Sequence, residues 1–280
     1  MTDSTKYSEF RTLSVTSSDG VAEVTIQRPE ALNSLSRQSF HEFRQLWRQI
    51  RGDRDVRCVI VTGAGDRAFC TGVDRSDFLE SDTGFDDGLH FGAVDGTPFS
   101  YDDLGDFVGP KSNDLWVPVI AAVNGMACGG AFYLLGEVDF VIASEDATFF
   151  DPHVTYGLVA AFEPIHMLQK MPLQEIMRMS LLGNHERMTA RRAHEIGLVS
   201  QVTTKADLLE EARWAAGVIA GQPPLAVQGT VRALWMGQEL PRSQAIAMAV
   251  PIVGLANDPR NVVEGQRAFK AKSRPSWRPR

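Results

Sequence analysis

Two glycine-containing loops are the segments of this 280-residue chain best suited to chemistry. Residues 69–74 read FCTGVD, and residues 124–131 read NGMACGGA. Each follows a predicted strand and opens a helix-like stretch, where free backbone N–H groups and the helix dipole favour negative charge. Glycine permits the backbone angles and the close ligand approach that such a loop needs. Two such loops facing one another would stabilise a developing oxyanion, while tight helix–strand packing is the alternative explanation of each loop alone.

Three side chains close to these loops in sequence are suited to proton transfer. His153 ionises near neutrality, which suits a general acid or base, and a carboxylate two residues earlier, Asp151, would support it. Tyr133 has a hydroxyl that can donate to an oxyanion or orient a leaving group. Glu163 interrupts an apolar run at residues 158–162. The structural alternatives are a packed histidine, a tyrosine in a pocket wall and a glutamate that caps the following helix.

The elements that must position these residues indicate an α/β fold, because predicted strands alternate with helices. Ser36 is the expected N-cap of a helix that carries Phe40, Phe43, Trp47 and Ile50 at helical spacing. Strands are expected at residues 21–27, 58–61, 68–70, 117–123, 139–143 and 148–150. Helices are expected at residues 131–135, 173–182, 189–195, 206–220, 224–235, 243–255 and 261–272.

The chain divides on this reading into an α/β core, residues 1–200, and a helical C-terminal region, residues 201–280. The second part is expected to serve oligomerisation and closure of the ligand site. The first part contains an irregular segment, residues 76–114, which is rich in Asp, Gly and Ser. This segment includes His90, which we expect to be exposed. Long irregular segments inside compact domains are often functional. His166 and His194 fall in predicted helices and are expected to be packing or surface groups.

Composition excludes several classes of protein. The formal net charge of −7 and the pI of about 5.4 argue against a dedicated nucleic-acid binder. No apolar run approaches the roughly 18 residues of a membrane span, and the polar N-terminus has no signal core. Cys58, Cys70 and Cys128 are predicted to be buried free thiols in a reducing compartment, with no metal site. We therefore expect a cytoplasmic protein.

Five segments together resemble the crotonase, or enoyl-CoA hydratase/isomerase, superfamily. They occur in the family's order over residues 21 to 277. They are VAEVTIQRPEALNSL at 21–35, GDRAFCTGVD at 65–74, PVIAAVNG with CGG at 118–130, EIGLV at 195–199, and Glu264-Gly265 with Ala268-Phe269, Lys272 and Pro275.

The resemblance implies a spiral of ββα units with a helical C-terminal region, assembled as a trimer or a dimer of trimers. It implies an acyl-CoA substrate that brings its own coenzyme A, with no separate cofactor, and a lyase or isomerase reaction. The N–H groups of Val73 and Gly130 would hold the thioester oxygen. The adenine would lie near Ala31 and Leu32. Lys272 would contact the CoA phosphates, from its own or a neighbouring subunit, unless the basic end is simply solvated.

The sequence departs from the hydratase pattern at two positions. The resemblance places glutamates where this chain has Tyr133 and His153, and hydration of a double bond needs groups that handle water and the α-proton. A tyrosine with a pKa near 10 is a poor base, so we expect no efficient hydratase activity. His153, assisted by Tyr133 and Glu163, is the expected acid/base.

Two other functions stay open. Loss of both glutamates also fits a non-catalytic acyl-CoA binding protein. A histidine at position 153 also resembles the β-diketone hydrolase branch, which cleaves a carbon–carbon bond and need not use CoA. The acyl group and the exact reaction do not follow from the sequence.

Overall fold

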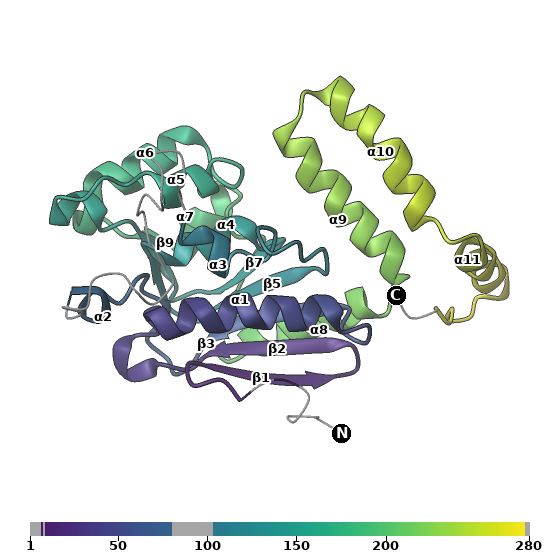
Figure 1. Cartoon of the computed structure of the whole chain (residues 1–280), viewed down its shortest axis with the longest axis horizontal. Coiled ribbons are helices and arrows are strands. Elements are labelled where there is room, and N and C mark those ends of the chain that lie inside the picture. Colours follow the sequence, from purple (N-terminus) through teal and green to yellow (C-terminus); the bar gives the residue numbers. More distant parts are fainter. Residues whose placement is uncertain (1–6, 8, 80–102, 278–280) are drawn as a thin grey trace, which may run out of the picture.

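The computed structural model describes residues 7, 9–79 and 103–277 (Figure 1). His90 and most of the irregular segment 76–114 lie outside the described residues. The predicted α/β class is confirmed by two sheets with helices against them.

The main sheet has strand order β1-β2-β3-β5-β7-β10, and every neighbouring pair except β1–β2 is parallel. Its central strands β3 and β5 are buried along their whole length, because continuously apolar runs are covered on both faces. The bounds are Leu13–Ser18 (β1), Val21–Ile26 (β2), Cys58–Gly63 (β3), Val119–Val123 (β5), Phe140–Ser144 (β7) and Gln201–Thr203 (β10).

A smaller sheet, β4-β6-β8-β9, is built from the strands that follow those of the main sheet. β3 is followed by β4, β5 by β6 and β7 by β8, so the chain repeats one two-strand step three times. Asn124 joins two of these steps by donating to the carbonyl oxygens of Gly63 and Gly65, each at 2.9 Å. The bounds are Ala68–Cys70 (β4), Met126–Cys128 (β6), Thr148–Phe150 (β8) and Met188–Thr189 (β9).

Helices cover both faces of the main sheet (Figure 1). The helix α1 starts where predicted, since Ser36 accepts a hydrogen bond from the Ser39 amide, and it buries Phe43 and Trp47. The helix α8 packs its alanine-rich face on the other side of the sheet. The core helices are η1 (Pro29–Ala31), α1 (Arg37–Gly52), α2 (Arg75–Leu79), α3 (Gly105–Val108), α4 (Ala131–Glu137), η2 (His153–Tyr156), α5 (Phe162–Met167), α6 (Leu173–Leu182), η3 (Gly183–His185), α7 (Ala190–Glu195) and α8 (Leu208–Ala220).

The last three helices form an arm that projects from this core (Figure 1). They are α9 (Pro224–Glu239), α10 (Arg242–Ala256) and α11 (Pro259–Ala271). The helix α10 has no buried residue, although it is apolar all round. The arm begins after α8, because β10 and α8 are joined to the main sheet. The division of the chain between residues 200 and 201 stays a prediction.

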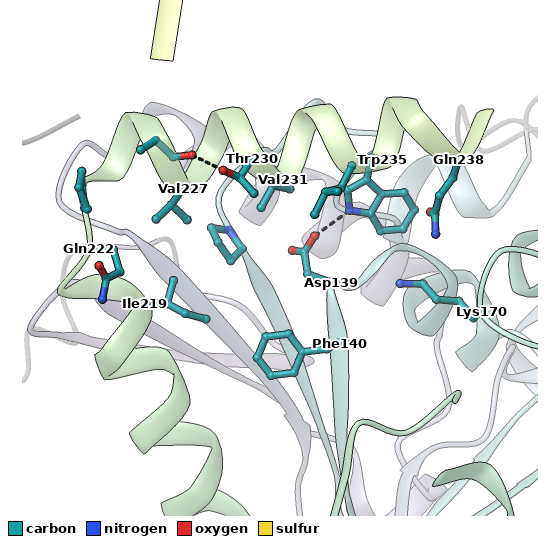
Figure 2. A pocket seen from close by; sticks show the side chains of 14 residues that line it. Asp139, Phe140, Lys170, Ile219, Gln222, Val227, Thr230, Val231, Trp235 and Gln238 are labelled. Atoms are coloured by element: carbon teal, nitrogen blue, oxygen red, sulfur yellow. Dashed lines mark hydrogen bonds between the residues drawn. The ribbon is translucent and has the colours of Figure 1, made fainter. Parts of the chain in front are cut away.

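The base of the arm is held by a largely shielded carboxylate. Figure 2 shows Asp139 accepting a hydrogen bond from the Trp235 indole of α9, at 2.7 Å. The other oxygen of Asp139 accepts from Lys111 at 2.9 Å and from the Val119 amide at 2.7 Å. Lys170 lies over the Trp235 ring, and burial lowers its pKa to about 8.

We expect Asp139→Ala to lower the free energy of unfolding by about 3–5 kcal/mol, because it leaves a buried lysine without its counter-charge. The ion pair is mostly shielded, with side-chain exposures of 8% for Lys111 and 13% for Asp139. Urea unfolding measures the change. The control is Glu195→Ala, which breaks solvent-exposed ion pairs and should leave the unfolding midpoint unchanged. Equal midpoints for both variants would contradict the proposed anchor.

Candidate functional site

A cavity of about 660 Å³ gathers most of the residues singled out from the sequence. It opens where the carboxyl ends of the short strands β6 and β8 meet η2 and α5. Six of the eight predicted site residues line it: Leu32, Val73, Gly130, Tyr133, His153 and Glu163. Residues far apart in the sequence are therefore brought to one hollow of the size that holds small-molecule ligands.

The two glycine loops approach each other at the backbone on one wall of this cavity. A β-carbon built on Gly72 would lie 2.6 Å from the amide nitrogen of Gly130, and one built on Gly130 would lie 3.2 Å from the amide nitrogen of Val73. Gly72 also has a φ of +83°, which L-residues rarely adopt. Contact this close requires glycine at position 72 and leaves a β-carbon at position 130 little room, so packing explains the glycines and also brings two amides together.

Hydrogen bonds orient the first loop. The Leu35 amide donates to the Gly72 carbonyl at 2.7 Å, and the Asp74 amide donates to the Leu35 carbonyl at 2.9 Å. Val73 lies between these two bonds in a parallel bridge, so its own N–H points away from Leu35. Among the described residues, no acceptor is found for the amides of Val73 and Gly130. Both N–H groups are thus available to a ligand in the cavity.

A second set of contacts fixes the loop to the segment before α1. Arg28 binds Asp74 at 2.8 Å and donates to the carbonyl oxygen of Ser34 at 2.7 Å. Asn33, fully buried, donates to the carbonyl oxygens of Ala64 and Ala68. These contacts explain why the RPEALN segment and the GVD loop occur together: one arginine and one asparagine hold the two backbones in register.

His153 lies between two carboxylates. Its Nδ1 is 2.5 Å from Oδ1 of Asp151, and its Nε2 is 3.3 Å from Oε1 of Glu163. Both carboxylates are shielded, with side-chain exposures of 0% for Asp151 and 5% for Glu163. The hydrogen bond to Asp151, and then that to Glu163, raise the pKa of His153 to about 10 against the opposing effect of burial.

This pKa corrects one expectation. With its pKa raised to about 10, His153 is expected to be mostly protonated at neutral pH, which favours donating a proton over accepting one. Glu163 is also more than a helix cap, since Ala161 occupies the N-cap of α5 while the glutamate faces the histidine and lines the cavity. The site therefore contains carboxylates after all, supplied by positions 151 and 163.

The free energy of unfolding should depend on pH because of this histidine. The folded pKa lies above the unfolded value of about 6.5, so the ion pairs stabilise the fold fully below about pH 6.5 and progressively less as the pH rises toward 10. We expect the difference in free energy of unfolding between the wild type and His153→Gln to be largest near pH 6 and smallest near pH 10. Urea titrations across this range measure it. An NMR midpoint for His153 between about pH 6 and 7 would contradict the interpretation.

Tyr133 lines the cavity from α4 with only 2% of its surface exposed. Its ring contacts the His166 ring edge-on, with centroids 5.5 Å apart. His166 pairs with Asp103 at 3.3 Å, and this contact raises the pKa of the histidine. Gly105 packs against both rings. His166 is therefore a packing group, as expected, and it also supports the phenol of Tyr133.

The three predicted CoA contacts are separated in this chain. Leu32 lines the cavity in a left-handed conformation, with a φ of +52°, directly after Ala31 at the end of η1. Lys272 is exposed and caps the C-terminus of α11, the last helix of the arm. The structure thus brings Leu32 to the cavity, whereas neither Ala31 nor Lys272 lines it.

The wall of the cavity also contains one cysteine and two arginines. Cys128 lines it, and burial raises the pKa of its thiol to about 12, so it is no thiolate nucleophile. All three cysteines are free and buried, as predicted. Arg75 and Arg187 also line the cavity, and sequence reasoning missed them because isolated arginines in amphipathic segments carry no pattern.

Comparison with known proteins decides the family. The model of the enoyl-CoA hydratase/isomerase family matches residues 16–280. The chain belongs to this family. It is 33% identical to (E)-benzylidenesuccinyl-CoA hydratase of Thauera aromatica over 263 residues, which cover 93% of this chain and 96% of that protein. It is 32% identical to carnitinyl-CoA dehydratase of Proteus mirabilis over 280 residues, which cover 96% and 99%.

Solved structures of the enoyl-CoA hydratase/isomerase family share the fold. An enoyl-CoA hydratase/isomerase from Mycobacterium paratuberculosis superposes with a TM-score of 0.85 at 35% identity, covering 98% of this chain and all of that one. The crotonase-like fold implied by the sequence is confirmed. The relatives are named as hydratases and dehydratases of CoA thioesters, so this chain is an enzyme of an acyl-CoA-processing family. Within the described residues, no helix has the length and apolar character to cross a membrane.

Proposed function

We propose that this member of the family forms an enolate from an acyl-CoA thioester and that Glu163 and His153 manage the proton. The observation that carries the proposal is one cavity lined both by Val73 and Gly130, whose amides have no acceptor among the described residues, and by the shielded His153–Glu163 pair. The thioester oxygen would accept hydrogen bonds from the N–H groups of Val73 and Gly130. Donors placed in advance of the reaction stabilise the developing charge more than the ground state.

The proton step follows from the charges. Glu163 takes the α-proton, the electron pair of the C–H bond moves into the enolate, and negative charge collects on the thioester oxygen between the two amides. His153 enters the step protonated, so it serves as the acid and as a fixed positive charge beside the carboxylate. Asp151 accepts from Nδ1 and from the His153 amide, which holds the ring with Nε2 toward Glu163.

We propose that the protein does not hydrate simple enoyl-CoA esters efficiently. Tyr133 and His153 replace the two glutamates that the family resemblance places on the active face, and Tyr133 is left to donate to an oxygen or shape the pocket. The remaining carboxylate, Glu163, contacts His153 directly. Glu163 would handle the α-proton, and Asp151 is already bound to Nδ1 of His153, so our proposal assigns no second base to water.

The test is exchange of the α-protons of butyryl-CoA in D2O, followed by mass spectrometry, with thermal shift read in parallel. Exchange catalysed by the protein supports the enolate. Stabilisation by the thioester without exchange would identify a non-catalytic acyl-CoA binding protein. Neither signal would favour the β-diketone hydrolase. Rapid loss of enoyl absorbance with crotonyl-CoA would show that the expectation about hydration is wrong.

Three further proposals concern the subunit assembly, the coenzyme A contacts and the cellular location of the enzyme. The exposed apolar side chains of α10 support a homotrimer or a dimer of trimers in which residues 201–280 make the subunit contacts. In such an assembly Lys272 would bind the CoA phosphates of a neighbouring subunit, while Ala31 and Leu32 would lie beside the adenine. Analytical ultracentrifugation tests the assembly. A cytoplasmic location stays a prediction, to be tested by cell fractionation.

A further inference from the structure

Two arginines in the wall of the cavity have no carboxylate partner within the part of the chain that the structure describes. Arg75, at the start of α2, and Arg187, just before β9, both line the cavity that contains His153. Among the described residues, neither forms an ion pair, whereas nearby Arg178 and Arg192 each bind a glutamate. Arginines facing a ligand cavity without a counter-charge are suited to an anionic ligand group, which they can bind through two parallel N–H bonds.

Both guanidinium groups are held in place by aromatic rings. The Cζ atom of Arg75 lies 4.9 Å from the ring centroid of Tyr156, and that of Arg187 lies 4.4 Å from the ring centroid of Phe150. Arg187 also donates to the sulfur of Met126 at 3.1 Å, a weak acceptor that leaves most of its N–H groups free. Stacking restricts the side chains and so reduces the entropy lost when an anion binds.

The rings flank the proposed acid. Phe150 precedes His153 by three residues and Tyr156 follows it by three, at the end of β8 and the end of η2. The hydroxyl of Tyr156 accepts from the side chain of Asn184, which also lines the cavity and lies three residues before Arg187. Each arginine therefore contacts a ring three residues from His153 in the chain, and both line the cavity where the acyl group would react.

We infer that the acyl group of the substrate carries its own carboxylate, bound by Arg75 and Arg187. The inference rests on the proposed function, because it assumes that the acyl part of a CoA thioester occupies this cavity. It also disfavours a cationic acyl group, because each of the rings of Phe150 and Tyr156 already has a guanidinium over one face and a second positive charge nearby would be repelled. The phosphates of coenzyme A are a second possible source of negative charge, and the experiment distinguishes them.

The experiment measures dissociation constants of the full-length protein for five compounds by calorimetry. Glutaryl-CoA and adipyl-CoA carry a terminal carboxylate, 5-methylhexanoyl-CoA is the uncharged isostere of glutaryl-CoA, 4-(trimethylammonio)butyryl-CoA is cationic, and free CoA has no acyl group. We expect at least one dicarboxylic thioester to bind at least tenfold more tightly than the uncharged one. We expect the cationic thioester to bind more weakly than the uncharged one.

Arg187→Gln and Arg75→Gln should each abolish most of this preference and leave the affinity for free CoA unchanged. Arg178→Gln is the matched control, because this arginine is bound to Glu186 and does not line the cavity. Equal affinity for charged and uncharged thioesters would overturn the inference while leaving the proposed function intact. Equal weakening of all five compounds in the two variants would assign the arginines to the CoA phosphates and also overturn it. Binding of no thioester would refute the proposed function itself.

Discussion

Glu163→Gln is expected to lower the rate of α-proton exchange in a bound thioester by a factor of about 10² to 10⁴, the usual contribution of a general base. Glutamine keeps the size and shape of the side chain but cannot accept the proton. Since Glu163 lines the cavity and faces Nε2 of His153 at 3.3 Å, little else in the structure should change. The measurement is deuterium incorporation into butyryl-CoA at saturating concentration, so that binding does not enter the comparison.

A second readout separates a catalytic role from a structural one. Loss of the glutamate removes one of the two contacts that raise the pKa of His153, so the NMR titration midpoint of this histidine should fall below its wild-type value of about 10. The affinity for the thioester should stay within a factor of about two. Glu186→Gln, which alters an exposed glutamate outside the cavity, is the control and should exchange at the wild-type rate. Wild-type exchange in Glu163→Gln would assign the base to another group.

The sequence was sufficient wherever the structure depends on local pattern. The run from Cys58 to Val61 gave a buried strand, the serine at position 36 capped its helix, and the two glycine loops came to face one cavity. In each case the signal lies within a few neighbouring residues. The edge strand β1 was not predicted, because Leu13 and Val15 are its only apolar residues and so short an alternation does not mark a strand without its pairing to β2.

The charge state of the site depends instead on tertiary contact. His153 in isolation is an ordinary histidine, and only the return of α5 places Glu163 against its Nε2. The nine intervening residues have no regular period and gave no means of predicting that distance. The same holds for Arg187, which reaches the cavity from the segment before β9, more than thirty residues after His153. Chemistry that arises from packing becomes visible only in three dimensions.

Gly72→Ala is expected to lower α-proton exchange by about 10²–10³-fold, the effect of losing one oxyanion donor. The new β-carbon would lie 2.6 Å from the Gly130 amide nitrogen and 2.9 Å from the Cys128 carbonyl oxygen. Both of these atoms belong to the backbone, so the two loops must separate. Separation moves the amides of Val73 and Gly130 out of the geometry that holds one oxygen.

The control distinguishes this effect from ordinary strain. Gly197 has a φ of +89°, close to the +83° of Gly72, but a β-carbon built on it meets nothing within 4 Å. Gly197→Ala should therefore lose about 1–2 kcal/mol of stability from the left-handed conformation alone and keep the wild-type exchange rate. Gly72→Ala should bear the same strain and in addition lose the reaction, as measured by exchange at a temperature where both variants are folded. If both variants exchange at equal rates, the approach of the two loops serves packing and not the stabilisation of an oxyanion.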